Sequence, residues 1–469
     1  MTQVQSFGAA ETVTGSCHLL QLDSGLKVLI DCGYFQGGSE LHNLDEFGFN
    51  PQDIDILLLT HAHLDHVGRI PKLVTEGFSG RMIALRNTIE LAQVVLTDSA
   101  NIAEADYERA LKKSEQNPDS KPVPKPFITL DSVRAVFDLN TQYVHYNKPI
   151  NLSHGVKAIF RNAGHILGSA TIEIEIADTD KKKKRGKRLV FSGDLGSSKS
   201  LLMPPIGKIR RADTLYIEST YGDQNHRSLK ESIEEFKSVI LNTLKQHGNV
   251  IIPSFAIART QEILLLLKQM YLKDELPHCK VYLDSPMAIK ATQIYSLNYQ
   301  ALNDSAQHWL HQQGELFDFP YLQYSLKGND ELQIEQQKKG CIIIAGSGMC
   351  SGGRILKHLK QRLSHPENSI LFVGYQVEGT LGRQLIDGVE SIRLYHQEIE
   401  VKAKIHMVRG FSAHADQNDL LNWLAEFEKL DNLYLIHGDP DKQAVLKQVI
   451  KERLKINAHI VKQGEKITV

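Results

Sequence analysis

The sequence His61-Ala62-His63-Leu64-Asp65-His66 gathers four metal-ligand side chains within six residues. Neutral imidazole nitrogens and carboxylate oxygens suit a borderline cation such as zinc. The cluster follows the apolar run 54–59, which is typical of a buried strand of a parallel sheet. We therefore expect it in a loop at the carboxyl end of a strand, where open α/β sheets hold their sites. A polar surface turn is the alternative, but so many ligands side by side favour a site for two metals.

Further residues that could do chemistry follow other predicted strands along the chain. They are Asp31, His165, Asp194, Glu218, His414 and His437. His165, Asp194 or His437 alone is more typical of a loop residue than of a metal ligand, and Asp31 alone is as typical of an ordinary turn. However, strand ends gather at one edge of a parallel-type sheet, so residues that are distant in sequence converge there. Taken with the histidine cluster, these positions predict one composite site.

This supply of ligands matches two zinc-type ions that share a hydroxide, each ion with three or four protein ligands. The expected ligands are His61, His63 and His165 for one ion, and Asp65, His66 and His437 for the other, with Asp194 as the bridge. Asp31 is better placed to accept a hydrogen bond from a ligating imidazole and so to fix its tautomer. A bridging hydroxide would attack near neutral pH, and an oxygen leaving group would then need a proton. His414 suits that role, with Glu218 to orient it.

Composition restricts the class of protein. The 469 residues favour two domains, and 42% hydrophobic and 23% charged residues are the proportions of a soluble globular protein. No apolar run is long enough to span a bilayer and no secretory signal is evident, so we expect a cytoplasmic protein without a membrane partner. Five scattered cysteines indicate reduced thiols. The net charge of −1 gives no global basic field, so a nucleic-acid partner would have to be attracted by local patches and by the metals.

Alternating strand and helix patterns predict an α/β fold with a second α/β unit of its own. In that second unit, apolar runs at 250–253, 281–283 and 341–345 read as buried strands, and 229–247 and 260–273 read as amphipathic helices. This alternation is typical of a doubly wound sheet. The basic run 181–188 reads as a solvated hairpin turn, with a phosphate-binding tip as the less favoured alternative.

The motifs resemble those of a known family. His61 to His66, Gly164-His165, Ser192-Gly193-Asp194 and Asp31 resemble the metal motifs of the metallo-β-lactamase superfamily. The segments 218–222, 411–416 and 436–438 resemble three further motifs of its β-CASP branch, which includes the mRNA 3′-end processing endonuclease and prokaryotic ribonucleases. The resemblance runs from about Phe7 to His437. A histidine at 437 is similar to the RNA-acting members rather than to the DNA-processing ones.

The resemblance implies a fold and a division into domains. The family fold is an αββα sandwich with an inserted doubly wound β-CASP domain, which here corresponds to 211–405 inserted between 1–210 and 406–469. It also implies two zinc ions held by the seven ligands named above, catalytic roles for Asp65 and Asp194 as metal ligands, and an active site between the domains. His414 would protonate the leaving oxygen, hydrogen-bonded to Glu218. A homodimer is the assembly that the family suggests.

A glycine-rich loop in the second unit is the expected contact for RNA phosphate. Its residues are Ser347, Gly348, Met349, Ser351, Gly352 and Gly353, between a predicted strand and the predicted helix 354–363. Backbone N–H groups at such a loop can hold a phosphate, and the family uses the comparable loop for RNA backbone. Tight packing of strand against helix is the alternative.

The leading hypothesis is a zinc-dependent ribonuclease that hydrolyses phosphodiester bonds of single-stranded RNA through a hydroxide bridging two metals. Two alternatives remain open: another hydrolase of this fold that acts on DNA or on a small ester, thioester or lactam, and a non-catalytic RNA-binding subunit. The inserted domain disfavours a small substrate, and the complete ligand set disfavours a non-catalytic subunit. Endonucleolytic and exonucleolytic action are not distinguished.

Overall fold

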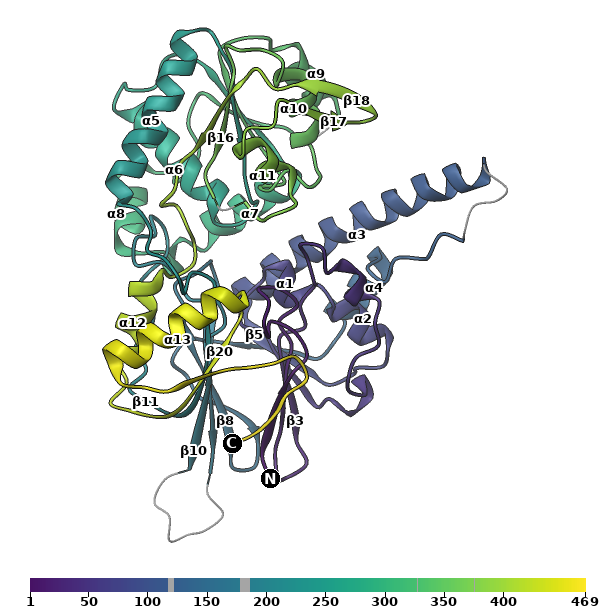
Figure 1. Ribbon diagram of the computed structural model, residues 1–469, viewed down its shortest axis with the longest axis vertical. Helices are drawn as coiled ribbons and strands as arrows, with labels where there is room; N and C mark the ends of the chain where they lie inside the picture. Colours follow the sequence, from purple (N-terminus) through teal and green to yellow (C-terminus); the bar gives the residue numbers. More distant parts are fainter. Residues whose placement is uncertain (117–121, 178–185, 327, 375) are drawn as a thin grey trace. The chain divides into compact units, whose positions relative to one another are not determined.

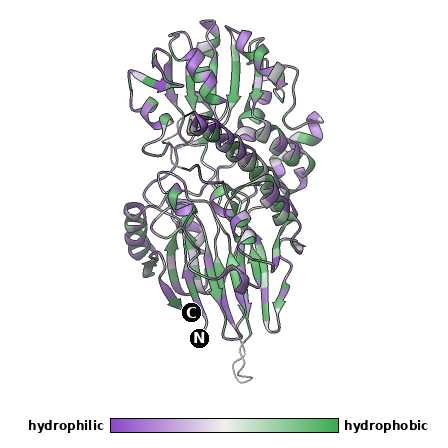
Figure 2. Ribbon diagram, turned by 90° about the vertical axis from the view of Figure 1, so that its right-hand side faces the viewer, coloured by the Kyte–Doolittle hydropathy of each residue, from purple (hydrophilic) through white to green (hydrophobic). Residues whose placement is uncertain are grey.

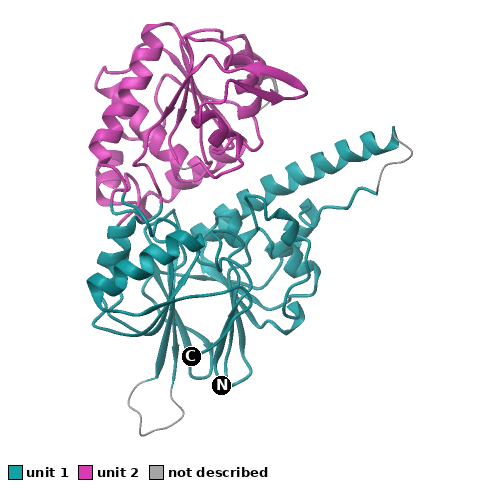
Figure 3. Ribbon diagram, viewed as in Figure 1, with its two compact units in different colours: residues 1–198, 205–225, 414–469 teal, residues 199–204, 226–413 magenta. Residues whose placement is uncertain are grey.

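The computed structural model describes residues 1–116, 122–177, 186–326, 328–374 and 376–469. The chain forms two compact units: unit 1 comprises residues 1–198, 205–225 and 414–469, and unit 2 comprises residues 199–204 and 226–413 (Figure 3). The basic run 181–188 expected at a hairpin tip lies mostly outside the described residues, although the two strands that flank it pair antiparallel.

Unit 1 is a sandwich of two seven-stranded sheets (Figure 1). The first sheet has the order β22 (Lys466–Thr468), β1 (Gln3–Ser6), β2 (His18–Gln21), β3 (Lys27–Ile30), β4 (Ile56–Leu58), β5 (Arg81–Leu85), β6 (Thr141–Val144). The second has the order β21 (Ala458–Ile460), β20 (Lys429–Ile436), β11 (Arg211–Glu218), β10 (Lys187–Phe191), β9 (Ala170–Ile176), β8 (Val156–Asn162), β7 (Ile150–Ser153). Hydrophobic residues concentrate along the strands (Figure 2). Their inward-facing side chains form one core between the sheets, which includes Ile30 and Leu58 from the first sheet and Phe160 and Phe191 from the second.

Helices complete the sandwich on both outer faces. They are α1 (Leu64–Val67), α2 (Ile70–Thr75), α3 (Arg86–Glu115), α4 (Leu130–Phe137), α12 (Gln417–Ala425) and α13 (Pro440–Leu454), with short 3₁₀ turns at Glu40–Asn43 and Pro51–Asp53. The helices α12 and α13 bury an apolar stripe, including Leu420, Trp423 and Leu446, against Leu215 and Ile217 of β11. This αββα arrangement confirms the fold class predicted from the sequence.

Unit 2 is built around a six-stranded parallel sheet. Its order is β14 (Leu322–Tyr324), β13 (Lys280–Asp284), β15 (Cys341–Ala345), β12 (Val250–Pro253), β16 (Ser369–Phe372), β19 (Lys404–Met407). The helices are α5 (Leu229–Lys245), α6 (Arg259–Leu272), α7 (Pro286–Leu297), α8 (Asp304–Gln313), α9 (Gly328–Gln336), α10 (Ile355–Arg362) and α11 (Leu381–Ile386), joined by a 3₁₀ turn at Tyr299–Ala301 and the hairpin β17 (Ser391–Leu394)–β18 (Gln397–Glu400). Every residue of β12 and β15 is buried, as a central parallel strand covered on both faces requires. The doubly wound sheet predicted for the second unit is therefore present.

The chain reverses its winding direction at the centre of this sheet. β12 and β15 are neighbours, but β12 is followed by α6 and leads towards β13, whereas β15 is followed by α10 and leads towards β16. The two crossovers therefore depart in opposite directions. Such a switch point leaves a crevice outside the carboxyl ends of the two strands, where open α/β sheets bind ligands.

The compact units divide the chain at other residues than the sequence suggested. The boundary expected at 210/211 falls immediately before β11, yet β11 pairs in parallel with both β10 and β20 and belongs to unit 1. Unit 2 ends at Ala413, whereas the boundary expected from the sequence was 405/406. Hydrogen bonding across β11 sets the first difference, and a strand pattern alone does not reveal which sheet a strand joins.

All five cysteines are free, and all five are buried. Among the described residues, no helix combines the length and the apolar character needed to cross a bilayer.

Candidate metal centre

The predicted ligands meet within unit 1 at the carboxyl ends of strands from both sheets. Asp31 follows β3 and His61 follows β4 in the first sheet, whereas Asp194 follows β10 and His437 follows β20 in the second. The expectation of one parallel sheet edge was therefore incomplete: β9 runs antiparallel to β8 and β10, and two sheets share the edge. The expectation of a loop was also wrong for Asp65 and His66, which lie on the short helix α1.

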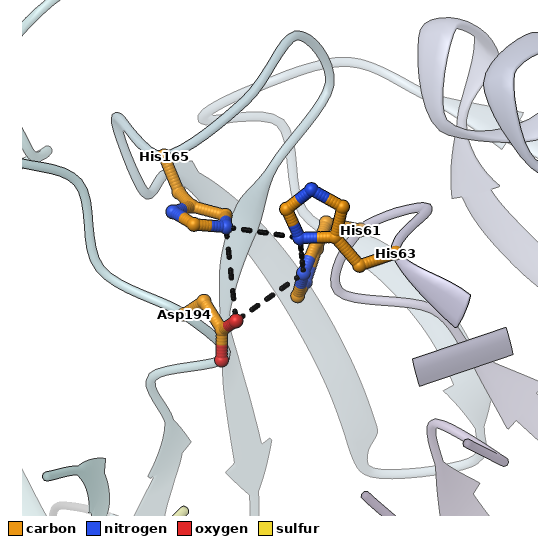
Figure 4. A group of neighbouring side chains, drawn as sticks. All are labelled: His61, His63, His165 and Asp194. Atoms are coloured by element: carbon orange, nitrogen blue, oxygen red, sulfur yellow. Dashed lines mark hydrogen bonds and ion pairs between the residues drawn. The ribbon is translucent and has the colours of Figure 1, made fainter. Parts of the chain in front are cut away.

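The first group of side chains is His61, His63, His165 and Asp194 (Figure 4). The Nδ1 atom of His63 lies 3.1 Å from Nε2 of His61 and 3.1 Å from Nε2 of His165. Asp194 Oδ2 lies 3.4 Å from Nε2 of His61 and 3.7 Å from Nε2 of His165. A zinc ion with Zn–N bonds of about 2.0–2.1 Å in tetrahedral geometry separates its ligand atoms by about 3.3 Å. These spacings fit one ion among the four side chains.

The second group is Asp65, His66, His437 and, again, Asp194. The Nε2 atoms of His66 and His437 are 3.2 Å apart, and Asp65 Oδ2 lies 3.5 Å from Nε2 of His437. Asp194 turns its other oxygen to this group, since Oδ1 lies 3.3 Å from His66 Nε2 and 3.5 Å from His437 Nε2. The two oxygens of the Asp194 carboxylate thus face different groups: Oδ2 faces the first group and Oδ1 faces the second. This geometry suits the bridging position expected for Asp194.

The surroundings of the Asp194 carboxylate indicate whether a cation fits between the two groups. Both its oxygens are buried and accept no hydrogen bond from the described residues, which would be costly for an ionised carboxylate unless a charge compensates it. Burial opposes the charged form, yet His437, His66 and His61 hold the pKa of Asp194 well below its usual range. An unbonded buried carboxylate ringed by imidazole nitrogens is the chemistry of a metal site, so the residues present fit one.

Hydrogen bonds behind the predicted ligands set which ring nitrogen His61 and His66 turn towards the site. Thr60 Oγ1 lies 2.7 Å from Asp31 Oδ2, a carboxylate oxygen that can only accept, so the hydroxyl proton goes to Asp31. Thr60 Oγ1 must then accept from Nδ1 of His61, 3.1 Å away, which leaves Nε2 of His61 as a lone-pair donor. Asp31 Oδ2 also accepts from Nδ1 of His66 at 2.7 Å. Asp31 therefore holds Nδ1 of His66, and Nε2 of that ring faces His437.

The same logic applies to His437. The Thr220 hydroxyl lies 3.3 Å from the His437 carbonyl oxygen, to which it donates, and 3.1 Å from His437 Nδ1, from which it accepts. Sequence reasoning missed both threonines. Thr60 directly precedes the histidine cluster, and a hydroxyl residue between a buried strand and a ligand is the signal that could have identified it.

Burial favours the neutral form of two imidazoles of the first group, His61 and His63. It lowers the pKa of His61 well below the ordinary value and lowers the pKa of His63 to about 4. His66 differs: burial opposes its charged form, but Asp194, Asp31 and Asp65 together raise its pKa well above the ordinary value. Three carboxylates around one histidine indicate a strongly negative pocket that favours a cation.

The backbone at the centre carries local strain and close contacts. Asp31 and His437 adopt positive φ angles of 59° and 50°, which are uncommon for residues other than glycine. Such conformations cost of order 1–3 kcal/mol each and cluster at functional sites. Gly33 is required by close approach, because a Cβ there would lie 1.5 Å from the carbonyl oxygen of Asp65. That oxygen accepts a hydrogen bond from Ser16 N at 2.9 Å, which anchors α1 beside the ligands.

His414 and Glu218 form a pair next to Asp194. Nδ1 of His414 lies 3.3 Å from Glu218 Oε1, and Glu218 is fixed in turn by hydrogen bonds from Leu195 N (2.6 Å) and Thr220 N (3.3 Å). The Ala415 amide donates to Leu195 O at 2.7 Å, which holds His414 beside the loop that carries Asp194. Burial disfavours the imidazolium, but Glu218, Asp194 and Asp65 raise the pKa of His414 to about 9. The pair can therefore hold a proton next to the candidate metal ligands.

The hydrogen bonds of Thr60 lead to a testable prediction. We expect Thr60→Val to lower zinc affinity about 10- to 100-fold, because the His61 tautomer and the Asp31 carboxylate both lose their partner. Thr60→Ser keeps the hydroxyl and should retain most of the affinity. Competition with a chromophoric chelator measures both variants, with circular dichroism to confirm folding. Equal affinity in the valine and wild-type proteins would contradict the assigned tautomer.

The glycine-rich loop of unit 2 follows β15, as predicted. Within it, Ser351 N donates to Ser347 Oγ at 3.0 Å and Ser347 N donates to Gly352 O at 3.2 Å, so these two amides are already bonded. The amides of Gly348, Met349, Gly352 and Gly353 have no acceptor among the described residues. The structure therefore narrows the backbone donors expected for phosphate from six residues to four.

A buried polar network supports this loop. Asp284, at the end of β13, accepts hydrogen bonds from Arg354 Nη1 and from His358 Nε2, both at 2.7 Å. Arg354 directly follows Gly353, and it also donates to Ser325 O at 3.2 Å. Burial opposes ionisation of Asp284, but His358, Ser325 and Arg354 lower its pKa to about 2. The network thus ties the end of the loop to two neighbouring strands.

The lowered pKa predicts how acid affects unit 2. Because the folded pKa lies below the unfolded value of about 3.9, ionised Asp284 contributes about 2 kcal/mol, which is fully present above pH 4 and lost as the pH falls through about 2. Asp284→Asn should lower the free energy of unfolding by about 3 kcal/mol at pH 7, since Arg354 and His358 lose their carboxylate. Urea unfolding from pH 7 downwards should show this difference shrinking below pH 4. The exposed Asp304→Asn serves as control, and a difference that does not change with pH would contradict the assignment.

Comparisons with known proteins agree with this architecture. Family models match as "Metallo-beta-lactamase superfamily" at residues 11–81, "Beta-Casp domain" at 260–385 and "Zn-dependent metallo-hydrolase RNA specificity domain" at 398–461. A crystal structure of a protein of unknown function from Enterococcus faecalis covers all of this chain and all of its own with a TM-score of 0.55 at 13% identity, which is a likeness of fold.

Three relatives align over almost the whole chain. Ribonuclease TTHA0252 of Thermus thermophilus is 36% identical over 451 residues, which cover 96% of each chain. An RNase J-like protein of Methanocaldococcus jannaschii is 29% identical, covering 99% of each chain. Transcription termination factor FttA of Methanosarcina mazei is 29% identical, covering 99% of this chain and 71% of its own. The chain belongs to the β-CASP branch of the metallo-β-lactamase superfamily.

Proposed function

We propose that this chain is a zinc-dependent ribonuclease that hydrolyses phosphodiester bonds of single-stranded RNA at the metal centre of unit 1. One observation supports the proposal above all others. The two carboxylate oxygens of Asp194 face two different groups of possible metal ligands, and the His414–Glu218 pair lies beside them. The proposal draws its substrate from the relatives named ribonuclease and RNase J-like, and from the family model described as an RNA specificity domain.

The residues that would hold the metals are the two groups described above. His61, His63 and His165 would bind one zinc ion, Asp65, His66 and His437 would bind the other, and Asp194 would bind both. Zinc supplies a water of lowered pKa as nucleophile and positive charge that stabilises the phosphorane-like transition state. Thr60, Asp31 and Thr220 contact Nδ1 of His61, His66 and His437, which would leave Nε2 of these three rings for the ions.

His414 would act as the general acid that completes the reaction. His414 holds a proton because Nδ1 donates to Glu218, and Nε2 is the nitrogen from which a proton can pass to the leaving oxygen. Cleavage of RNA expels an alkoxide, which is a strong base, so proton transfer from a positioned imidazole is worth about 10²- to 10⁴-fold. Glu218 orients the ring and favours its charged form.

Other parts of the proposal concern substrate and setting. The glycine-rich loop of unit 2, with donors at Gly348, Met349, Gly352 and Gly353, would hold the RNA backbone. Five buried, free cysteines suit a reducing compartment such as the cytoplasm. The inserted domain at 211–405 and the homodimer stay predictions, the second to be checked by light scattering.

Digestion of RNA labelled at either end tests the function. Purified protein with zinc should cleave single-stranded RNA, and a zinc chelator should abolish the cleavage. The pattern of labelled products also distinguishes endonucleolytic from 5′ or 3′ exonucleolytic action. Hydrolysis of DNA or of a thioester panel with none of RNA would overturn the proposal.

A further inference from the structure

Phe255 is an exposed aromatic side chain in an otherwise buried loop of unit 2. The loop follows β12, and its other residues Ser254, Ala256, Ile257 and Ala258 are at most 5% exposed. Phe255 is 42% exposed. Burying this ring would contribute about 2 kcal/mol by the usual transfer scale, and the loop does not do so. The ring therefore keeps a sizeable apolar face open to a binding partner.

Hydrogen bonds from α6 hold the backbone of the Phe255 loop. The carbonyl oxygen of Phe255 accepts hydrogen bonds from Thr260 Oγ1 at 2.8 Å and from Thr260 N at 3.3 Å. Ala256 O accepts from Gln261 Nε2 at 3.0 Å. Both donors belong to the first turn of α6, so the backbone of Phe255 is fixed to a helix. A fixed backbone with an exposed ring is the arrangement of a preformed binding surface.

One side of the ring lies against the glycine-rich loop. A Cβ at Gly348 would lie 2.7 Å from Cδ2 and 2.9 Å from Cε2 of Phe255, so glycine at 348 is what allows the ring to rest there. Gly348 is held in turn, because its carbonyl oxygen accepts from Gln376 Nε2 at 3.0 Å. The ring thus lies directly beside the loop that carries the amides of Met349, Gly352 and Gly353, and the two together make up the candidate binding surface.

This surface lies at the switch point of the sheet. The Phe255 loop follows β12 and the glycine-rich loop follows β15, the two neighbouring strands whose crossovers depart in opposite directions. An aromatic face beside a set of backbone donors matches the two chemically different parts of one nucleotide, a planar base and a phosphate. Bases stack on aromatic side chains in a sequence-tolerant manner because every base has a π-face.

We propose that Phe255 is a stacking platform for one unpaired nucleobase of the substrate, next to the phosphate held by the glycine-rich loop. This inference rests on the proposed function and makes it more specific. A base can reach the ring only if it is not paired in a helix, so Phe255 would select single-stranded over duplex RNA. The platform is tolerant of sequence, since stacking reads no hydrogen-bonding edge.

Stopped-flow fluorescence of a 2-aminopurine-labelled oligoribonucleotide tests the platform before cleavage begins. Wild-type protein should quench the fluorescence on binding. Phe255→Ala should weaken binding about 5- to 100-fold, as expected for the loss of one base–aromatic contact, and should reduce the quenching. Phe255→Leu, which keeps the apolar volume without the π-face, should resemble Phe255→Ala, and Phe255→Trp should restore binding. Tyr395→Ala, which removes an aromatic ring that is 52% exposed elsewhere in unit 2, should bind as wild type does.

A chain of abasic ribose phosphates of the same length isolates the stacking contribution. It should bind wild type and Phe255→Ala equally, because only the base meets the ring. If Phe255→Ala binds single-stranded RNA as tightly as wild type, or loses the abasic chain equally, the platform is refuted while the ribonuclease proposal stands. If wild type neither binds nor cleaves RNA, the proposed function itself fails.

Discussion

His414→Ala should cleave single-stranded RNA about 10²- to 10⁴-fold more slowly than the wild-type protein, the usual contribution of a positioned general acid. The reason is the position of the ring: Nδ1 lies 3.3 Å from Glu218 Oε1, next to the loop of Asp194, while the predicted ligand set excludes His414. Zinc content should therefore stay close to that of wild type. Metal analysis and initial rates on labelled RNA measure the two quantities in the same preparation.

A substrate with a good leaving group separates proton donation from other roles of His414. The p-nitrophenolate ion leaves without a proton, so hydrolysis of bis(p-nitrophenyl) phosphate should change little in His414→Ala. His459→Ala, which removes a half-exposed histidine of unit 1, should leave both activities unchanged. An equal loss on both substrates would show that His414 acts by another route than protonating the leaving group.

The second large effect is expected at Asp194. Asp194→Ala removes the carboxylate whose two oxygens lie 3.3–3.7 Å from imidazole nitrogens of both ligand groups. Each group then keeps only three side chains, and the like charges of two ions lose the anion between them. We expect fewer than one zinc ion per chain and a fall in RNA cleavage of about 10³-fold or more, since metal catalysis is worth several kcal/mol.

The control for Asp194 is an aspartate on the same unit that faces solvent. Asp431→Asn, at a half-exposed carboxylate of β20, should keep both zinc and activity. Retention of the wild-type zinc content by Asp194→Ala would refute the shared position of this carboxylate. Loss of zinc with full activity would refute the metal mechanism altogether.

Much of the site was predictable because its predicted ligands directly follow apolar strands. The histidine cluster follows β4, Asp194 follows β10 and His437 follows β20, and each polar residue at the end of a buried run is visible in the sequence. What the sequence could not show is that the strands belong to two sheets that share an edge. Sheet membership depends on long-range hydrogen bonds, such as the pairing of β11 with β20, which a strand pattern does not reveal.

The sequence also did not reveal the threonine hydroxyl groups that orient the predicted ligands. Thr60 and Thr220 are ordinary residues by type, and only the distances to Asp31, His61 and His437 reveal their roles. Phe255 was overlooked for the opposite reason, because it lies within an apolar segment and reads as core. Its exposure depends on how the chain turns from β12 into α6, which hydrophobic patterning does not specify.

Zinc titration of the metal-free protein, with RNA cleavage followed at each step, tests the two-metal account most directly. We expect two zinc ions to bind per chain, with cleavage of single-stranded RNA appearing as the second ion binds. Full activity with one ion per chain, or no cleavage of RNA with two, would contradict it.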